Sequence, residues 1–248
     1  MSIAAIVITK NEASSIKTCL DSLNWVDEII VVDSGSADET VAICRTYTDK
    51  VLETDWPGFG PQKNRALALA TQAWVLSLDA DERVTPELRE EMEAVMADPA
   101  GKTAFAMPRR SSYCGKPMRH GGWWPDYVTR LFRRGQARFS DDLVHERLIV
   151  DGPVGRLRQP LLHEAFTDPE DVLETMNRYS TAGARMMHTR NERATLFTAL
   201  LHGLWTFLST YGFRGGFLDG REGFMLAVSN AEGTYYKYLK LMLLAEKK

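Results

Sequence analysis

The chain has 248 residues, of which 44% are hydrophobic and 25% charged, and its formal net charge is −3. These values are typical of a globular protein, exclude a disordered or fibrous chain, and argue against a nucleic-acid partner. The three cysteines, Cys19, Cys44 and Cys114, form no CxxC pair, which argues against a disulfide framework and favours a reducing compartment. The first residues, MSIAAIVITKNE, lack the basic region of a signal peptide, so we expect no export.

The charge is distributed unevenly along the chain. Residues 1–100 contain 8 basic and 18 acidic side chains, residues 101–182 contain 13 and 10, and residues 183–248 contain 9 and 5. An acidic first part and a basic last part suit a metal-bearing site followed by a surface that meets anionic lipid or substrate. Ordinary scatter of surface charge gives the same pattern, so the gradient alone does not decide between the two.

The first 80 residues alternate between short apolar runs and segments with helical periodicity. The predicted strands are residues 3–8, 28–33, 51–54 and 74–78. The predicted helices are residues 14–23, 38–46 and 61–70, with Asp38 as the N-cap of the second. Strands that alternate with helices through short links predict an α/β fold with a parallel sheet covered on both faces.

The pattern changes after residue 102. Short strand-like pieces with Gly and Pro over residues 103–162 predict an antiparallel addition to the sheet. Beyond Asp168 the sequence is helical, with predicted helices at residues 170–188, 193–211 and 220–245. We therefore expect a helical C-terminal extension.

Polar residues follow the predicted strands, at the edge where parallel sheets bind their ligands. They are Thr9, Lys10, Asn11 and Glu12 after the first strand, Asp33 after the second, and Asp79 and Asp81 after the fourth. Carboxylates on such a loop can bind Mg²⁺ or Mn²⁺ together with diphosphate oxygens. An isolated Asp-x-Asp turn is common, but its position after a strand, near Asp33, favours a metal site.

Four motifs in the first 85 residues together resemble the glycosyltransferases of family 2, which are inverting enzymes with a GT-A fold. They are ITKNE at 8–12, VDSGSADET at 32–40, QKNRA at 62–66 and LDADE at 78–82. Three later segments resemble the branch of bacterial lipopolysaccharide core β-glucosyltransferases. They are VHE at 144–146, LLHEAF at 161–166 and GFLDGREGF at 216–224.

The resemblance implies a Rossmann-like, mainly parallel sheet flanked by helices. It implies a GT-A catalytic domain over residues 1–168, with the nucleotide-sugar half at about 1–100 and the acceptor half at about 101–168. The helical extension then covers residues 169–248.

The resemblance also assigns a nucleotide pocket. It implies that Asp33 accepts a hydrogen bond from the uracil imide and that the segment Thr9–Glu12 lines the pocket. It directs Lys63 and Arg65 at the nucleotide or its diphosphate, a contact that suits their charge. Judged without the family, Asp33 in Asp-Ser-Gly-Ser is typical of a turn, and the two basic residues are typical of a solvated helix face.

A metal site is implied beside this pocket. Asp81 is the predicted direct ligand of Mn²⁺ or Mg²⁺, with Asp79 reaching the ribose or, through water, the metal. His163 resembles the late histidine that many GT-A enzymes bring to the metal, and a structural histidine beneath a loop is the alternative. The metal would offset charge on the departing nucleoside diphosphate.

Two segments are predicted to serve the acceptor. Glu146 matches the position of the base that deprotonates the acceptor hydroxyl, with Asp142 and His145 as competitors. The residues that resemble the flexible acceptor loop are Gly121, Gly122, Trp123 and Trp124. A tryptophan face can stack on a sugar, but a double Trp can equally be core packing.

The C-terminal helices carry apolar residues at helical spacing. The run from Leu196 to Tyr211 predicts an amphipathic helix that is too short to span a bilayer. The last helix combines Tyr and Leu with Lys237 and Lys240, a composition that suits an interfacial helix on an anionic leaflet. Packing on the core or on a second subunit is the alternative.

These observations predict a metal-dependent, inverting transferase that moves a hexose, glucose by resemblance, from a UDP-sugar to a lipid-linked oligosaccharide. The branch implies a heptose-type acceptor of the lipopolysaccharide inner core, and a peripheral location on the cytoplasmic face of the inner membrane. A polyprenyl-phosphate sugar transferase shares the early motifs. A catalytically idle nucleotide-binding protein would bind UDP without turnover. A dinucleotide oxidoreductase is disfavoured because no GxGxxG follows the first strand.

Overall fold

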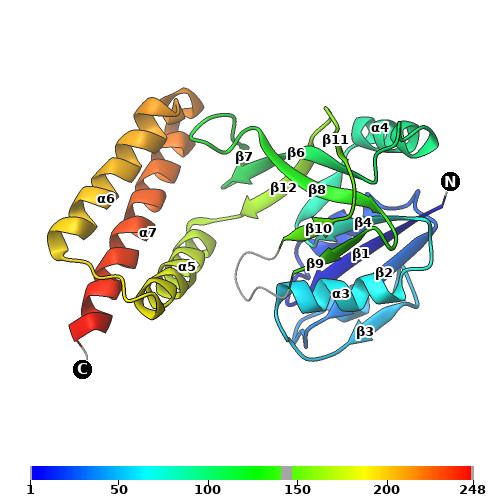
Figure 1. Cartoon of the computed structure of the whole chain (residues 1–248), viewed down its shortest axis with the longest axis horizontal. Coiled ribbons are helices and arrows are strands. Elements are labelled where there is room, and N and C mark those ends of the chain that lie inside the picture. Colours follow the sequence, from blue (N-terminus) through cyan, green and yellow to red (C-terminus); the bar gives the residue numbers. More distant parts are fainter. Residues whose placement is uncertain (1, 141–146, 247–248) are drawn as a thin grey trace. The chain divides into compact units, whose positions relative to one another are not determined.

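The computed structural model describes residues 2–140 and 147–246 (Figure 1). The chain divides into two compact units. The first unit comprises Met1–Arg109 and Asp126–His163, and the second comprises Arg110–Pro125 and Glu164–Lys248. The functional boundary at residue 168 stays a prediction.

The first unit contains the predicted parallel sheet. Its strands are β1 (Ile3–Thr9), β2 (Glu28–Asp33), β3 (Val51–Glu53) and β4 (Trp74–Asp79), in the spatial order β3-β2-β1-β4. The helices between them are α1 (Ile16–Asp21), α2 (Thr40–Cys44) and α3 (Phe59–Leu69). The α/β prediction is therefore confirmed. Helix α2 begins two residues later than expected, and its N-cap is Glu39. The prediction of Asp38 as N-cap is wrong, because Asp38 Oδ1 accepts hydrogen bonds from Thr40 N and Oγ1 in the preceding turn.

The central strand β1 separates two apolar cores, since alternate side chains of a strand point to opposite faces. Ile3, Ala5 and Val7 face a core that includes residues of α1 and of α4 (Pro86–Ala97). Ala4, Ile6 and Ile8 face a second core that includes Ala66 of α3. All seven residues of β1 are buried. This double burial explains why the strand is an uninterrupted apolar run.

The rest of the sheet is mainly antiparallel, as predicted. Its strands are β5 (Glu82–Val84), β6 (Ala104–Tyr113), β7 (Lys116–Pro117), β8 (Asp126–Arg133), β11 (Val154–Arg156) and β12 (Leu161–Phe166). Strand β8 pairs antiparallel with β4 and β6, and β12 pairs antiparallel with β5. Strand β11 differs, since it runs parallel to β6. Strands β9 (Ala137–Phe139) and β10 (Leu148–Val150) form a separate pair.

Helix α4 was not predicted from the sequence, although its start carries clear signals. Thr85 is the N-cap and accepts a hydrogen bond from Leu88 N, and Pro86 occupies the first turn. Both features favour the beginning of a helix. The buried side of α4 consists of Leu88, Met92 and Met96, which repeat every four residues.

The second unit contains the predicted C-terminal helices. They are α5 (Pro169–Thr189), α6 (Leu196–Leu208) and α7 (Gly220–Glu246), and both α5 and α6 pack on α7. Helix α6 is shorter than predicted at both ends. It begins three residues later, because Thr195 is its N-cap and accepts a hydrogen bond from Thr198 N, and a π-helical turn, Ser209–Phe213, replaces its last turn. Among the described residues, no helix combines the length and apolar character needed to cross a membrane.

The lysines of α7 do not have the surroundings that we expected of headgroup-binding residues. Lys240 Nζ donates to Asn177 Oδ1, Ser180 Oγ and Thr181 Oγ1, each at 2.8 Å, and burial lowers its pKa. Lys237 lies over the ring of Tyr238, 5.0 Å from its centre. The ammonium group of Lys240 links α7 to α5, as in the packing alternative, and its contact with lipid stays a prediction.

The GFLDGREGF segment is a close-packed turn that leads into α7. A Cβ on Gly223 would lie 1.9 Å from Gly216 O, so the backbone approach requires glycine. Asp219 accepts hydrogen bonds from the backbone of Arg119 and His120, and its Oδ1 lies 2.8 Å from His120 Nδ1. Burial would raise the pKa of Asp219, but these donors lower it. The motif therefore joins residues 116–121 to the start of α7.

Candidate active site

The carboxyl ends of three strands meet at one edge of the sheet in the first unit. The pairing register places Thr9 of β1 opposite Asp33 of β2 and Ile8 opposite Asp79 of β4. Ligands of open α/β sheets bind at this edge. The structure thus brings together the polar residues that the sequence predicts there.

Asp33 is buried and organises its own loop. Its Oδ2 accepts from Thr9 Oγ1 at 2.9 Å and Ser36 Oγ at 2.5 Å, and its Oδ1 accepts from Gly35 N at 2.9 Å and Ser36 N at 2.8 Å. Four donors occupy the acceptor positions of a carboxylate. This is the turn role considered for Asp33, and its contact with uracil stays a prediction.

The loop after β1 is held against the loop after β2. Asn11 has a φ of 54°, a left-handed conformation that asparagine tolerates better than most residues. Its backbone N donates to Ser36 Oγ, and its Oδ1 accepts from Ala37 N, both at 2.8 Å. Glu12 N donates to Thr40 Oγ1 at 2.8 Å. The motifs at 8–12 and 32–40 therefore form one hydrogen-bonded platform.

Asp79 lies within a buried network of charges. Lys63 Nζ is 2.8 Å from Asp79 Oδ1, and Arg130 Nη2 contacts both Asp79 Oδ2 and, at 2.7 Å, Glu82 Oε1. Burial would raise the pKa of Asp79, but Arg130 and Lys63 hold it well below its usual range. Burial and the charge of Asp79 raise the pKa of Glu82. Lys63 therefore holds Asp79 ionised instead of facing solvent.

Two of these residues, Arg130 and Glu82, were not assigned a role from the sequence. Arg130 belongs to β8, and its side chain is 9% exposed. Arg109 of β6 lies 3.6 Å from Glu82 and 2.7 Å from Asp126. A basic residue in the middle of a strand was the available signal, but its carboxylate partners lie 48 and 51 residues away in sequence.

Asp81 and His163 lie side by side at the same edge. The antiparallel pairing of β12 with β5 places His163 opposite Glu82, and His163 Nε2 lies 3.2 Å from Asp81 Oδ2. The other oxygen, Asp81 Oδ1, is buried and has no hydrogen-bond partner among the described residues. A carboxylate oxygen without a partner next to an imidazole is a donor set that fits Mn²⁺ or Mg²⁺.

The described residues do not hold a complete metal-binding group of three or more His, Cys, Asp or Glu side chains. Mg²⁺ and its relatives commonly take one or two protein carboxylates and complete their shell with phosphate oxygens and water. Asp81 and His163 therefore suit a metal that arrives with a diphosphate.

The QKNRA motif connects α3 to several segments. Gln62 Nε2 donates to Ser34 Oγ at 2.9 Å, at the end of β2. Asn64 pairs twice with the backbone of Phe139 in β9, since its Nδ2 donates to Phe139 O and its Oδ1 accepts from Phe139 N, both at 2.9 Å. These contacts hold α3 and β9 beside the carboxyl edge.

Arg65 is turned toward the segment after β3. Its Nη1 donates to Asp55 Oδ1 at 2.7 Å and to Thr54 Oγ1 at 3.2 Å. The hydrogen bond from Arg65 lowers the pKa of Asp55. The predicted contact between Arg65 and a diphosphate would require this pairing to open, and it stays a prediction.

The predicted acceptor loop lies in the second unit. Gly121 and Gly122 have φ angles of 67° and 85°, which favour glycine. Trp123 packs against Tyr113 and Phe166, with ring centres 6.0 and 6.1 Å away, as in the core-packing alternative. Trp124 instead lies under the guanidinium group of Arg110, whose central carbon is 5.4 Å from the centre of the Trp124 ring.

The predicted base Glu146 and its alternatives Asp142 and His145 lie outside the described residues. Their roles stay predictions.

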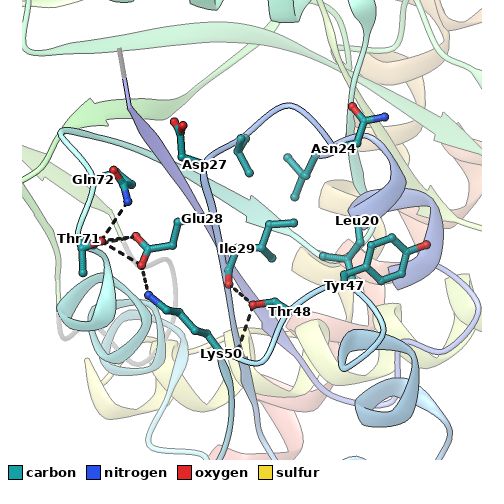
Figure 2. Close-up of a pocket in the computed structure, with 12 residues that line it drawn as sticks. Leu20, Asn24, Asp27, Glu28, Ile29, Tyr47, Thr48, Lys50, Thr71 and Gln72 are labelled. Atoms are coloured by element: carbon teal, nitrogen blue, oxygen red, sulfur yellow. Dashed lines mark hydrogen bonds and ion pairs between the residues drawn. The ribbon is translucent and has the colours of Figure 1, made fainter.

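A cavity of about 430 Å³ lies at the opposite, amino-terminal end of β2 (Figure 2). Its most buried charge, Glu28, pairs with Lys50 and accepts from Thr71 N at 2.8 Å. Thr48 Oγ1 donates to Ile29 O at 2.8 Å. Since these groups bind one another and link β2 to the segments before β3 and β4, we interpret the cavity as structural.

A parallel sheet with carboxylates at its carboxyl edge is typical of open α/β proteins that bind their ligands at that edge. Residues 4–151 match the family model Glycosyl transferase family 2, and the chain therefore belongs to glycosyltransferase family 2. The predicted family is confirmed.

The relatives extend over almost the whole chain. The lipopolysaccharide core biosynthesis glycosyltransferase LpsC of Rhizobium meliloti is 30% identical over 96% of this chain and 89% of its own. An uncharacterized glycosyltransferase of Rickettsia felis is 29% identical with the same coverage.

Solved structures share the fold. S. aureus TarS 1-349 in complex with UDP-GlcNAc aligns with a TM-score of 0.52 at 14% identity, over 100% of this chain and 92% of TarS. Mannosyl-3-phosphoglycerate synthase from Rubrobacter xylanophilus aligns with a TM-score of 0.51 at 17% identity, over 77% of this chain and 75% of its own. The predicted fold class is confirmed.

Proposed function

We propose that this glycosyltransferase is a metal-dependent, inverting enzyme. It transfers the hexose glucose from a UDP-sugar to a heptose-type acceptor of the lipopolysaccharide inner core. The relationship to LpsC over 96% of the chain supports the acceptor class. The single observation that carries the chemistry is the unpartnered Asp81 oxygen beside His163, at the edge where α/β folds bind nucleotides. The lipid-linked acceptor places the enzyme peripherally on the cytoplasmic face of the inner membrane.

Asp81 and His163 would hold Mn²⁺ or Mg²⁺, which when bound offsets the charge of the diphosphate leaving group. The chain prepares this site in two ways. Lys63 and Arg130 keep Asp79 ionised, so a carboxylate next to the donor stays an acceptor at neutral pH. The platform formed by the motifs at 8–12 and 32–40 is pre-organised by its own hydrogen bonds, which limits the entropy lost on binding.

Glu146 is the proposed base of the transfer. It takes the proton of the acceptor hydroxyl while that oxygen bonds to the anomeric carbon. The bond from the anomeric carbon to UDP breaks on the opposite face, and the electron pair leaves with UDP. Inversion at the anomeric carbon follows from this geometry.

Calorimetric titration with UDP tests the metal site. Wild-type protein in Mn²⁺ should bind UDP about tenfold or more tightly than in EDTA, a difference of about 1.4 kcal/mol. The Asp81→Asn variant should lose this difference, because it removes the charged ligand and keeps the size of the side chain. Asp98→Asn, an exposed carboxylate in the turn after α4, is the matched control and should behave as wild type. Equal UDP affinity and turnover of wild type in EDTA and Mn²⁺ would contradict metal dependence.

Acceptor choice is tested by turnover of UDP-glucose with two lipid acceptors. We expect transfer to heptose-containing core lipid and none to polyprenyl phosphate. Transfer to polyprenyl phosphate alone would assign the alternative reaction. UDP binding without turnover on either acceptor, with a panel of UDP-hexoses, would indicate a catalytically idle protein.

A further inference from the structure

Helix α6 presents its apolar side to solvent. The residues on this side are Leu196, Phe197, Leu200, Leu201, Leu204, Trp205 and Leu208, which we call the α6 face, and they are between 46% and 68% exposed. Their spacing follows the helical repeat, so they form one continuous stripe. A helix in a globular protein normally buries such a stripe. The α6 face therefore requires a partner.

The small and polar side of α6 is the side that packs on α7. Ala199 and Gly203 are the buried residues of the helix, and a Cβ on Gly203 would lie 3.2 Å from Tyr235. Thr206 Oγ1 donates to Thr234 Oγ1 at 3.2 Å. His202 stacks on Tyr238 with ring centres 4.3 Å apart. These contacts fix the rotation of α6, so the outward position of its apolar side is a property of the packing.

The apolar surface continues beyond the helix. Phe213, Phe217 and Leu218, in the turns between α6 and α7, are 77%, 52% and 61% exposed. From residue 193 to residue 218 the sequence contains no Asp or Glu, and its charged residues are Arg193 and Arg214. Arg193 precedes α6, and Arg214 lies between Phe213 and Phe217, so both charges within this stretch are positive.

We propose that the α6 face, with Phe213, Phe217 and Leu218, docks the enzyme on an anionic lipid surface. Leucine and aromatic side chains enter the boundary between headgroups and acyl chains, and flanking cations attract anionic headgroups. A specific protein interface carries about ten hydrogen bonds that set its register, whereas the α6 face consists of apolar residues with one indole N–H. The choice of lipid also rests on the proposed function, since a lipid-linked acceptor lies in such a surface.

Sedimentation with vesicles tests this docking. The full chain is mixed with vesicles of phosphatidylethanolamine containing phosphatidylglycerol, or with vesicles of phosphatidylcholine alone. The test variant combines Leu200→Gln, Leu204→Gln and Trp205→Gln, which alter exposed positions and leave the contacts with α7 in place. The control variant combines Leu69→Gln with Leu173→Gln, two exposed leucines on α3 and α5 that are 43% and 53% exposed.

Wild type and the control variant should bind the anionic vesicles, and added salt should weaken this binding. Both proteins should bind vesicles of phosphatidylcholine alone more weakly than the anionic vesicles. The test variant should bind at least about tenfold more weakly, because three apolar side chains no longer enter the interface. Its turnover on a water-soluble acceptor fragment should equal that of wild type. Unchanged vesicle binding by the test variant would overturn the proposal.

Size-exclusion chromatography separates lipid docking from self-association. A dimeric wild type that becomes monomeric in the test variant, with negligible vesicle binding by either, would show that a second copy covers the α6 face and would overturn the proposal. Loss of vesicle binding in the test variant would support docking even where wild type shows no transfer from UDP-sugars. Failure of the proposed function can therefore be distinguished from failure of the docking proposal.

Discussion

Arg130 shares one guanidinium group between the buried carboxylate of Glu82 and the partly exposed carboxylate of Asp79. Replacing it with Met would leave Asp79 facing Glu82 without the cation that separates their charges. Breaking a buried ion pair on one side costs about 3–5 kcal/mol. Urea unfolding of Arg130→Met should show a loss of this size. The double variant with Glu82→Gln should recover part of it, and a single variant as stable as wild type would contradict a central role for Arg130.

A second prediction separates binding from chemistry at Glu146. Glutamine keeps the size and polarity of the side chain but cannot accept the proton, so kcat of Glu146→Gln should fall by roughly 10²–10⁴. The affinity for UDP-sugar should change little. Steady-state kinetics and UDP titration on the same preparation measure both quantities. A near-normal kcat would transfer the role to Asp142 or His145, which the corresponding Asn and Gln variants would resolve.

The candidate site was predictable where its residues are adjacent in sequence. The motifs at 8–12, 32–40 and 78–82 follow strand ends, and a parallel sheet brings strand ends together. The basic residues that pair with these carboxylates were less predictable. Whether Lys63 meets solvent, a phosphate or Asp79 depends on the distance between α3 and β4, and no local pattern records this distance. Arg130 depends on the pairing of β8 with β4, a contact between distant parts of the chain.

At the scale of an element, the approach of Gly223 to Gly216 controls how α7 begins. Alanine at residue 223 would place a Cβ 1.9 Å from a backbone oxygen, so the turn would have to move. Overpacking of this kind costs about 1–3 kcal/mol or more. Thermal unfolding should show Gly223→Ala well below wild type.

Gly212→Ala provides the matched control for this change. An added Cβ there meets no atom within 4 Å, and Gly212 lies in the π-helical turn of the same unit. Its melting temperature should stay within about 2 °C of wild type, since a surface substitution away from special features changes stability by about 0.5 kcal/mol or less. Because alanine favours a helix more than glycine does, helix propensity cannot explain a loss in either variant. Equal losses in the two variants would contradict a special role for the contact with Gly216.

The elements themselves were largely predictable because each carries a repeat of its own. The strand over Glu28–Asp33 has the predicted bounds, and the last helix differs by one residue at its end. The orientation of α6 was not predictable from periodicity. An apolar stripe marks one side of a helix, but whether the stripe points inward depends on what the other side can fit. Here Gly203 and Thr206 allow the polar side to approach α7.

At the scale of the whole molecule, ligand binding should protect one edge of the sheet. UDP with Mn²⁺ should slow amide hydrogen exchange in residues 9–13, 33–40 and 79–82, because a ligand that binds only the native state suppresses local opening. Segments that line the cavity of Figure 2, residues 26–29 and 47–50, should exchange at the same rate with and without ligand. Mass spectrometry of peptides measures both sets in one experiment. Protection of the cavity segments alone would indicate that the nucleotide binds at the amino-terminal end of β2, and it would contradict the candidate site at the carboxyl edge.

The second unit is assembled from two separated stretches of chain, and this arrangement affects the order in which a newly made chain can fold. His120 binds Asp219, 99 residues later, and the Tyr113 hydroxyl meets Ser229 Oγ, 116 residues later. At about 5–20 residues per second, a ribosome needs roughly 5–20 s to supply those partners. During this interval Tyr113 and Trp123 exist in the growing chain without the helix that covers them. The nascent chain is therefore most exposed to aggregation, and most dependent on chaperones, between the synthesis of residues 125 and 229.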